Sequence, residues 1–148
     1  MESKNKDELV LGGTGQRLIN YVIDVFFINA VSLYLAHTLL GVDLAQFQYP
    51  FEITTDYFLV HAGCTLSYYL IFEFFLNKSF GKFITGTRVM DLEGGKPTLK
   101  IVFLRSLVRL LDIFYVLPSL FMLITRNITL HDLLSQTRVV DEKESQLF

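Results

Sequence analysis

The segment that decides the fold spans residues 17–40 and reads RLINYVIDVFFINAVSLYLAHTLL. After Arg17, its one charged residue is Asp24. A helix of this length extends about 36 Å, which is enough to cross the roughly 30 Å hydrocarbon core of a bilayer with some tilt. The run is too long for the apolar part of a cleaved signal peptide, and it carries an internal acid and asparagines. It therefore predicts a first transmembrane helix at about 17–40.

The composition of the whole chain agrees with a membrane protein. Of its 148 residues, 51% are apolar and 19% are charged, and the mean hydropathy is +0.42. A soluble chain usually carries about 25% charged residues. The formal net charge of −2 argues against a nucleic-acid partner, because domains that bind nucleic acid usually have a strong basic excess. The single cysteine, Cys64, excludes an intrachain disulfide and any multi-cysteine zinc site.

Two further apolar stretches follow the first. Residues 57–76 have the length and apolar density of a second span, with Glu73 near its end. Residues 99–125 form a third stretch, which is interrupted by charged residues and by Pro118. Its front half, to about Asp112, is amphipathic, and its back half is more apolar. We therefore expect a third membrane-embedded element that either spans the bilayer or re-enters it.

The positions of the basic residues predict the orientation, because Lys and Arg near the ends of spans mark the cytoplasmic side. The connection 41–56 holds none of the thirteen basic residues, whereas 1–17 holds three and 77–109 holds seven. We therefore expect a cytoplasmic N-terminal arm at 1–16 and an exposed outer loop at 41–56. The segment 77–100 is expected to be cytoplasmic as well.

A near repeat lies on either side of the third stretch. Thr87-Arg-Val-Met-Asp91 precedes it and Thr137-Arg-Val-Val-Asp141 follows it, and both are strand-like. They can pair in one small sheet only if both lie on the same side of the membrane. Same-side placement makes the third stretch re-entrant or surface-lying, with a bend at Pro118, and opposite-side placement makes it a plain third span.

Together these observations predict an all-α membrane protein with two to three transmembrane helices, a re-entrant or interfacial helix and a short cytoplasmic β-hairpin. The expected plan is the arm 1–16, one membrane domain over 17–141 and a polar tail at 142–148. A chain of 17.0 kDa has room for one domain.

Asp24 is the clearest candidate for a functional site. An ionisable residue within a span is a functional hypothesis by default, because a mid-helix aspartate costs about 3 kcal/mol on insertion. Arg17 lies on the same helical face, but seven residues separate the two by about 10.5 Å along the axis. That distance is long for an ion pair, so Asp24 is either protonated or paired with a residue of another element.

The third stretch supplies candidate partners for this acid. Arg105, Arg109 and Asp112 fall on one helical face. Two arginines one turn apart repel each other unless an acid lies between them, and Asp24 or Glu73 can be that acid. The arrangement is consistent with an ion or proton site, or with a static charge cluster that ties the third element to the first helix.

Other polar residues of the apolar stretches fit structural roles better. His61 shares a helical face with Thr65 and Tyr68, so we expect a hydrogen-bonded packing residue. Glu73 lies one turn before Asn77, from where its side chain can extend toward the inner interface, and we expect it to be the structural partner of a nearby arginine. Because the sequence contains no metal-ligand spacing and no catalytic constellation, we expect no metal, no cofactor and no enzymatic activity.

The order of several short motifs resembles that of the RDD family of bacterial integral membrane proteins. The motifs cover roughly residues 14–141 and are Gln16-Arg17-Leu18-Ile19, Asp24, Ser79-Phe80-Gly81-Lys82, Gly86-Thr87-Arg88-Val89-Met90-Asp91, Leu104-Arg105-Ser106-Leu107-Val108-Arg109, Leu130-His131-Asp132-Leu133-Leu134 and Thr137-Arg138-Val139-Val140. The family is named for one arginine and two aspartates. The resemblance implies Arg17 and Asp24 for the first two, and Asp132 for the second aspartate, with Asp112 as the alternative.

The resemblance implies a multi-pass protein of the bacterial inner membrane, in a family for which transport of an unidentified ligand is proposed and some members are linked to sodium/proton exchange. Two or three spans form a poor pore, so transport requires a homo-oligomer or another membrane protein as partner in the lipid bilayer. We expect either an oligomeric transport component for a cation or proton, or a non-catalytic scaffold that binds a partner. The candidate intramembrane polar site comprises Arg17, Asp24, Arg105, Arg109, Asp112 and Asp132, with Glu73 and His61 as secondary candidates.

Overall fold

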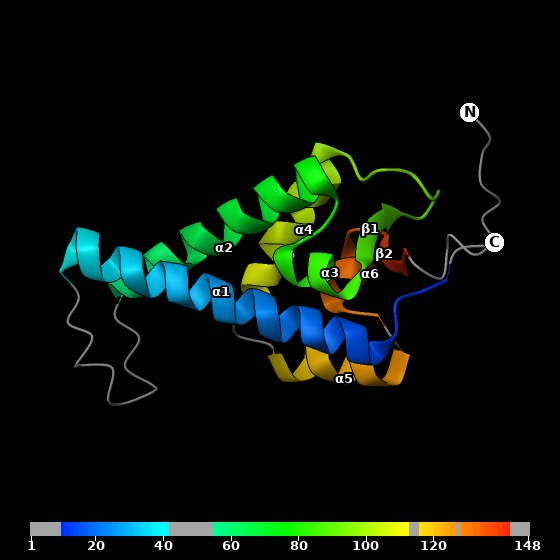
Figure 1. Ribbon diagram of the computed structural model, residues 1–148, viewed down its shortest axis with the longest axis horizontal. Coiled ribbons are helices and arrows are strands. Elements are labelled where there is room, and N and C mark those ends of the chain that lie inside the picture. Colours follow the sequence, from blue (N-terminus) through cyan, green and yellow to red (C-terminus); the bar gives the residue numbers. More distant parts are fainter. Residues whose placement is uncertain (1–9, 42–54, 113–115, 127, 143–148) are drawn as a thin grey trace.

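The computed structural model describes residues 10–41, 55–112, 116–126 and 128–142. The elements run in the order α1 (Thr14–Leu40), α2 (Thr55–Leu76), α3 (Phe80–Thr85), β1 (Thr87–Asp91), α4 (Leu99–Asp112), α5 (Val116–Arg126), α6 (Leu130–Leu134) and β2 (Thr137–Asp141). Figure 1 shows α1 and α2 as the longest elements, packed side by side, with the strands and short helices gathered toward one end of the pair. The predicted combination of mostly helical structure with one small pair of strands is confirmed.

α1 and α2 are long and apolar enough to cross a membrane. They contain 27 and 22 residues and match the two predicted spans, although each helix begins a few residues earlier than expected. α1 ends at Leu40 and is followed by Gly41, whose φ of 65° is the left-handed conformation that glycine adopts readily. Large apolar side chains such as Phe26 and Phe75 point away from the protein, which is compatible with a membrane location.

The near repeat forms the sheet, as predicted. β1 and β2 pair antiparallel over all five residues of each strand, with Val89 opposite Val139. Leu11 adds a further antiparallel bridge to Val140, so the end of the N-terminal arm lies along the other edge of β2. Residues 10–13 of the predicted arm thus contact the sheet before α1 begins at Thr14, and residues 1–9 lie outside the described part.

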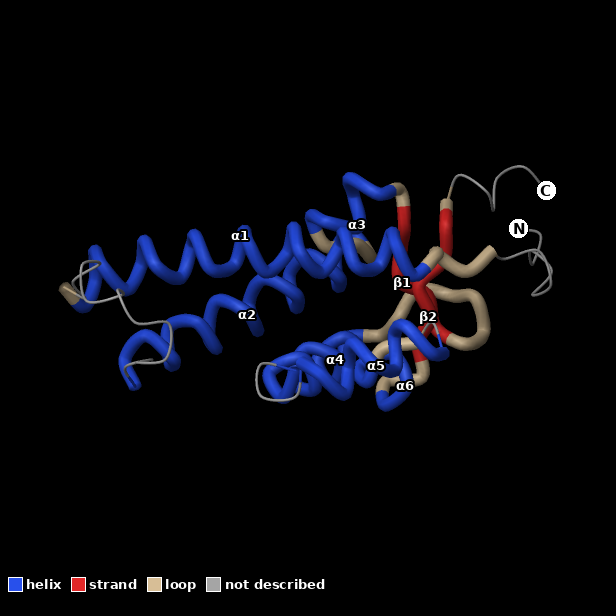
Figure 2. The backbone as a smooth tube through the Cα atoms, turned by 90° about the horizontal axis from the view of Figure 1, so that it is seen from below, coloured by secondary structure: helices blue, strands red, loops and turns tan. Residues whose placement is uncertain are grey.

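The third apolar stretch is divided between two helices. α4 and α5 contain 14 and 11 residues, or about 21 and 17 Å of helix, and each is shorter than a bilayer core of about 30 Å. α4 ends at Asp112 and α5 begins at Val116, so the two are separate elements. Pro118 lies in the first turn of α5, where proline costs no helical hydrogen bond. Figure 2 shows α4, α5 and α6 together on one side of α1 and α2, next to the strands.

α3 approaches α1 very closely. A Cβ atom at Gly81 would lie 2.5 Å from the backbone oxygen of Asn20, so only glycine fits at this contact. α3 then ends at Gly86, whose φ of 72° is again left-handed, and the chain turns into β1. The contact sets the distance between α1 and α3, and it brings the N–H of Gly81 next to Asp24.

Candidate functional site

A buried network of charged side chains joins five helices. Arg17 Nη1 on α1 lies 2.9 Å from Asp132 Oδ2 on α6. Arg105 on α4 contacts two acids, since its Nη1 lies 2.5 Å from Asp132 Oδ1 and its Nε lies 2.9 Å from Glu73 Oε2 on α2. Both contacts of Arg105 are ion pairs without the angles of a good hydrogen bond. The members of this charge network are Arg17, Glu73, Lys82, Arg105, Arg109 and Asp132, each at most 6% exposed.

Glu73 is the centre of the charge network. Its Oε1 accepts hydrogen bonds from Lys82 Nζ and from Arg109 Nη2, both at 2.7 Å. With Arg105, three cations therefore surround one carboxylate that has no exposed surface. The prediction that an acid lies between Arg105 and Arg109 is confirmed, and that acid is Glu73. The expected role of Glu73 as the partner of a nearby arginine is confirmed as well.

Asp132 forms the other end of the charge network, between Arg17 and Arg105. Burial on its own raises the pKa of this carboxyl, but the charges of Arg105, His131 and Arg17 outweigh burial and hold the pKa well below its usual range. Arg17 also donates to the carbonyl oxygen of Val139 at 3.1 Å. One guanidinium thus joins α1 to both α6 and β2.

Asp24 is paired with neutral donors. Its Oδ1 accepts hydrogen bonds from the Tyr68 hydroxyl at 2.7 Å and from the backbone N–H of Gly81 at 2.8 Å. Its Oδ2 accepts no hydrogen bond from the described residues. The predicted pairing of Asp24 with Arg105 or Arg109 is wrong, because Glu73 lies against both arginines while α3 presents its own donor to Asp24.

The remaining predicted residues are distributed around this site. His61 Nδ1 lies 3.2 Å from the Ser32 hydroxyl on α1, and its ring stacks on Tyr57, which is the expected packing role. The side chain of Asp112 lies outside the described part of the chain. Among the described residues, no group of three or more His, Cys, Asp and Glu side chains is placed to hold a metal ion.

Sequence reasoning missed two residues of the site, Lys82 and Tyr69. Burial lowers the pKa of the Lys82 amine, and the charge of Glu73 offsets part of that effect. The Tyr69 ring lies 3.7 Å from the Arg109 guanidinium carbon and is a cation–π partner. The Ser79–Lys82 motif was a usable signal for Lys82, whereas nothing in the sequence distinguished Tyr69 from the other tyrosines of α2.

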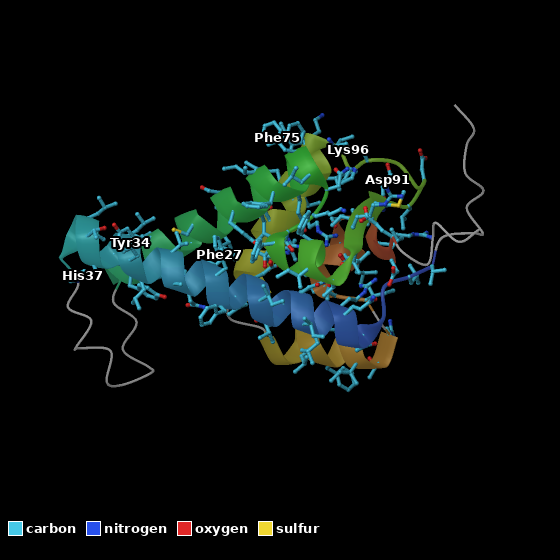
Figure 3. All side chains as sticks on the ribbon, viewed as in Figure 1. Phe27, Tyr34, His37, Phe75, Asp91 and Lys96 are labelled. Atoms are coloured by element: carbon cyan, nitrogen blue, oxygen red, sulfur yellow. The ribbon has the colours of Figure 1, made fainter. Side chains whose placement is uncertain are left out.

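A cavity of about 240 Å³ adjoins the charge network. Its walls come mainly from α1, and residues of α2, α3, α4, α5, α6 and β2 complete them. Figure 3 shows many side chains crowded where α3 and β1 lie next to α1. Apolar parts of the wall include Val25 and Ile28 of α1 and Leu120 and Leu123 of α5. The charged residues that line it are Arg17, Asp24, Lys82, Arg105, Arg109 and Asp132. The cavity therefore combines cationic and apolar walls.

The RDD family model matches residues 11–136 of the chain. The chain belongs to the RDD family. This match runs from the bridge at Leu11 to the turn before β2, so it includes both apolar helices and the whole charge network. Family membership and the two apolar helices together support a membrane protein. Neither a curated protein nor a solved structure matches the chain significantly.

We expect Asp24→Asn to keep its stability within about 1 kcal/mol of the original protein, because the amide oxygen can accept both hydrogen bonds that Oδ1 accepts now. Asp24→Leu leaves the Tyr68 hydroxyl and the Gly81 N–H buried without an acceptor, at about 1–3 kcal/mol each. Thermal unfolding of the protein in detergent measures both variants. If Asp24→Asn and Asp24→Leu lower the stability equally, the hydrogen bonds assigned to Asp24 do not account for its contribution to stability.

Proposed function

We propose that this RDD protein is a non-catalytic, multi-pass membrane protein that binds a ligand in the cavity beside the charge network, as the binding component of an oligomeric transport assembly. The observation that carries the proposal is the cavity itself, which brings charged and apolar walls together, with both apolar helices contributing to its lining. Charged residues at membrane depth are costly, and they mark ligand and ion pathways.

In this proposal α1 and α2 span the bacterial inner membrane, and the arm and the strands lie in the cytoplasm. The absence of basic residues from 41–56 supports this orientation. The proposal makes α4 and α5 a re-entrant pair, and the pairing of β1 with β2 supports this, because these two strands flank 99–125 in the sequence. Arg17 at the start of α1 and Glu73 near the end of α2 then place the charge network close to the cytoplasmic interface.

A scaffold without a ligand is the second candidate function. The observation that favours it is the pairing of both network carboxylates, Glu73 and Asp132, with cations from other helices. In that case the charge network only holds α4 and α6 against α1 and α2, and the cytoplasmic surface binds a partner. The transport candidate requires an oligomer, because two spans make a poor pore without further copies. The scaffold candidate does not require one.

The oligomeric state in lipid nanodiscs tests the transport proposal. We expect a complex that contains more than one copy of the chain. The mass of the complex, measured by light scattering with the lipid contribution subtracted, gives the number of copies. A monomer at all protein concentrations contradicts the transport assembly and favours the scaffold as the function.

The proposed topology predicts the sides from which single cysteines are labelled. In a Cys64→Ser background, Gln48→Cys should react with an impermeant maleimide added outside spheroplasts. Glu93→Cys and Ser145→Cys should react only after the membrane is opened, because they are placed on the cytoplasmic side. Labelling of position 145 from outside contradicts the re-entrant pair, and labelling of position 48 only from inside contradicts the whole orientation.

A further inference from the structure

We infer that the cavity binds the acidic head group of an amphipathic molecule, a carboxylate or phosphate attached to an acyl chain. This inference rests on the proposed membrane placement of α1 and α2, and it names the ligand class of the proposed binding site. Three observations carry it: the charge of the wall, unpartnered guanidinium nitrogens, and an apolar side of the cavity that reaches the outer surface of α1.

The charge of the wall favours an anion. Four cationic side chains line the cavity, and only two carboxylates, Asp24 and Asp132, line it with them. When Glu73 behind the wall is included, four cations still face three carboxylates. In a site removed from water this excess is screened weakly, so it attracts an acidic group and opposes a bare cation.

Two buried guanidinium nitrogens have donors to spare. Arg105 Nη2 and Arg109 Nη1 have no hydrogen-bond acceptor among the described residues. Both side chains line the cavity, and they are 0% and 6% exposed. An unpaired buried donor is costly, and a guanidinium binds the planar oxygens of a carboxylate or the oxygens of a phosphate in paired hydrogen bonds. An acid group that reaches these nitrogens from the cavity would supply the acceptors that the described residues do not provide.

The apolar side of the cavity reaches the outside of α1. Leu18, Tyr21 and Val22 line the cavity and are also 43%, 39% and 58% exposed. In a membrane, that exposed face of α1 meets acyl chains, and Leu123 of α5 lines the same cavity from another helix. About 240 Å³ accommodates a head group and the first methylenes, while the rest of the chain lies along α1 in the bilayer.

Asp24 gives the inference its sharpest test, because its negative charge lies in the same wall. If the ligand is an acid, Asp24→Asn removes a repulsion, and we expect binding to tighten three- to tenfold. If the ligand is a cation, the same change removes Asp24 Oδ2, a carboxylate oxygen that accepts no hydrogen bond from the described residues, and binding weakens. The two ligand classes thus predict opposite signs for a variant that keeps the hydrogen bonds of Oδ1.

The experiment measures the binding of three probes to the full chain in phosphatidylcholine nanodiscs. Radiolabelled palmitate represents a free fatty acid, phosphatidylglycerol represents a lipid head group, and inorganic phosphate represents the anion without a chain. We expect saturable binding of palmitate or phosphatidylglycerol. The probe that binds shows whether the acid group comes from a free fatty acid or from a lipid head group. Binding of phosphate alone, or of none of the three, overturns the inference.

Variants then place the bound molecule in the cavity. Leu123→Phe fills the cavity and should reduce binding at least tenfold, while Ile124→Phe on the 65% exposed face of the same helix should not change it. Arg109→Lys keeps the charge but removes Nη1, so binding should weaken severalfold.

Unfolding temperature and elution volume verify that each variant is folded. Equal binding by Leu123→Phe and Ile124→Phe overturns the site, and weaker binding by Asp24→Asn with competition by sodium overturns the ligand class.

The labelling assay uses no ligand, so its result is independent of these measurements. If labelling supports the topology and no probe binds, the inference about the acid group fails and the membrane topology stands. If labelling contradicts the topology, the proposed function fails whatever the binding result is.

Discussion

Glu73→Gln should sharply reduce the yield of folded protein, because it leaves Lys82, Arg105 and Arg109 buried around a neutral amide. Removing one partner of a buried ion pair costs about 3–5 kcal/mol, and here three cations lose their common carboxylate. Domains are stable by only about 5–15 kcal/mol in total. The measurements are the fraction of purified protein that elutes as a single species and its midpoint of thermal unfolding.

Glu93→Gln is the matched control for this change. It makes the same replacement at an exposed position in the turn after β1, where an effect within about 0.5 kcal/mol is expected. The double variant Glu73→Gln with Arg109→Gln should recover part of the lost stability, because it removes a cation whose ion pair among the described residues is with Glu73. If Glu73→Gln unfolds no more readily than Glu93→Gln, Glu73 is not the centre of the charge network.

The second large effect is expected for Asp132→Asn, which should lower the free energy of unfolding by about 3–5 kcal/mol at neutral pH. The change leaves Arg17 and Arg105 facing a neutral side chain. It also has a pH signature. The pKa of Asp132 in the folded protein lies below the value of about 3.9 expected for the unfolded chain, so its ion pairs contribute fully above that pH.

As the pH falls below about 4, the unfolded chain takes up a proton at Asp132 before the folded protein does, and this contribution declines. The difference in stability between the original protein and Asp132→Asn should therefore be constant from pH 7 to about pH 4 and shrink toward pH 3. Denaturant unfolding at a series of pH values measures it. A difference that grows on acidification contradicts the assignment.

Much of the architecture could be predicted from the sequence alone, because it depends on properties local to each segment. The length and apolar content of 17–40 and 57–76 predict two long helices whatever surrounds them. The near repeat at 87–91 and 137–141 predicted a strand pair, since two similar edge-strand patterns have matching faces. The spacing of Arg105 and Arg109 predicted an acid between them, because two buried like charges one turn apart require one.

Which acid that is, and what else joins the charge network, was decided only by the tertiary structure. Helical periodicity places a residue on a face of its own helix, but it does not set the rotation and axial offset of one helix against another. Here the close contact of Gly81 with Asn20 sets α3 against α1, so that α3 donates to Asp24 and its Lys82 reaches Glu73. An ion pair forms only within a few ångströms, so these offsets decide which of several candidate partners meet.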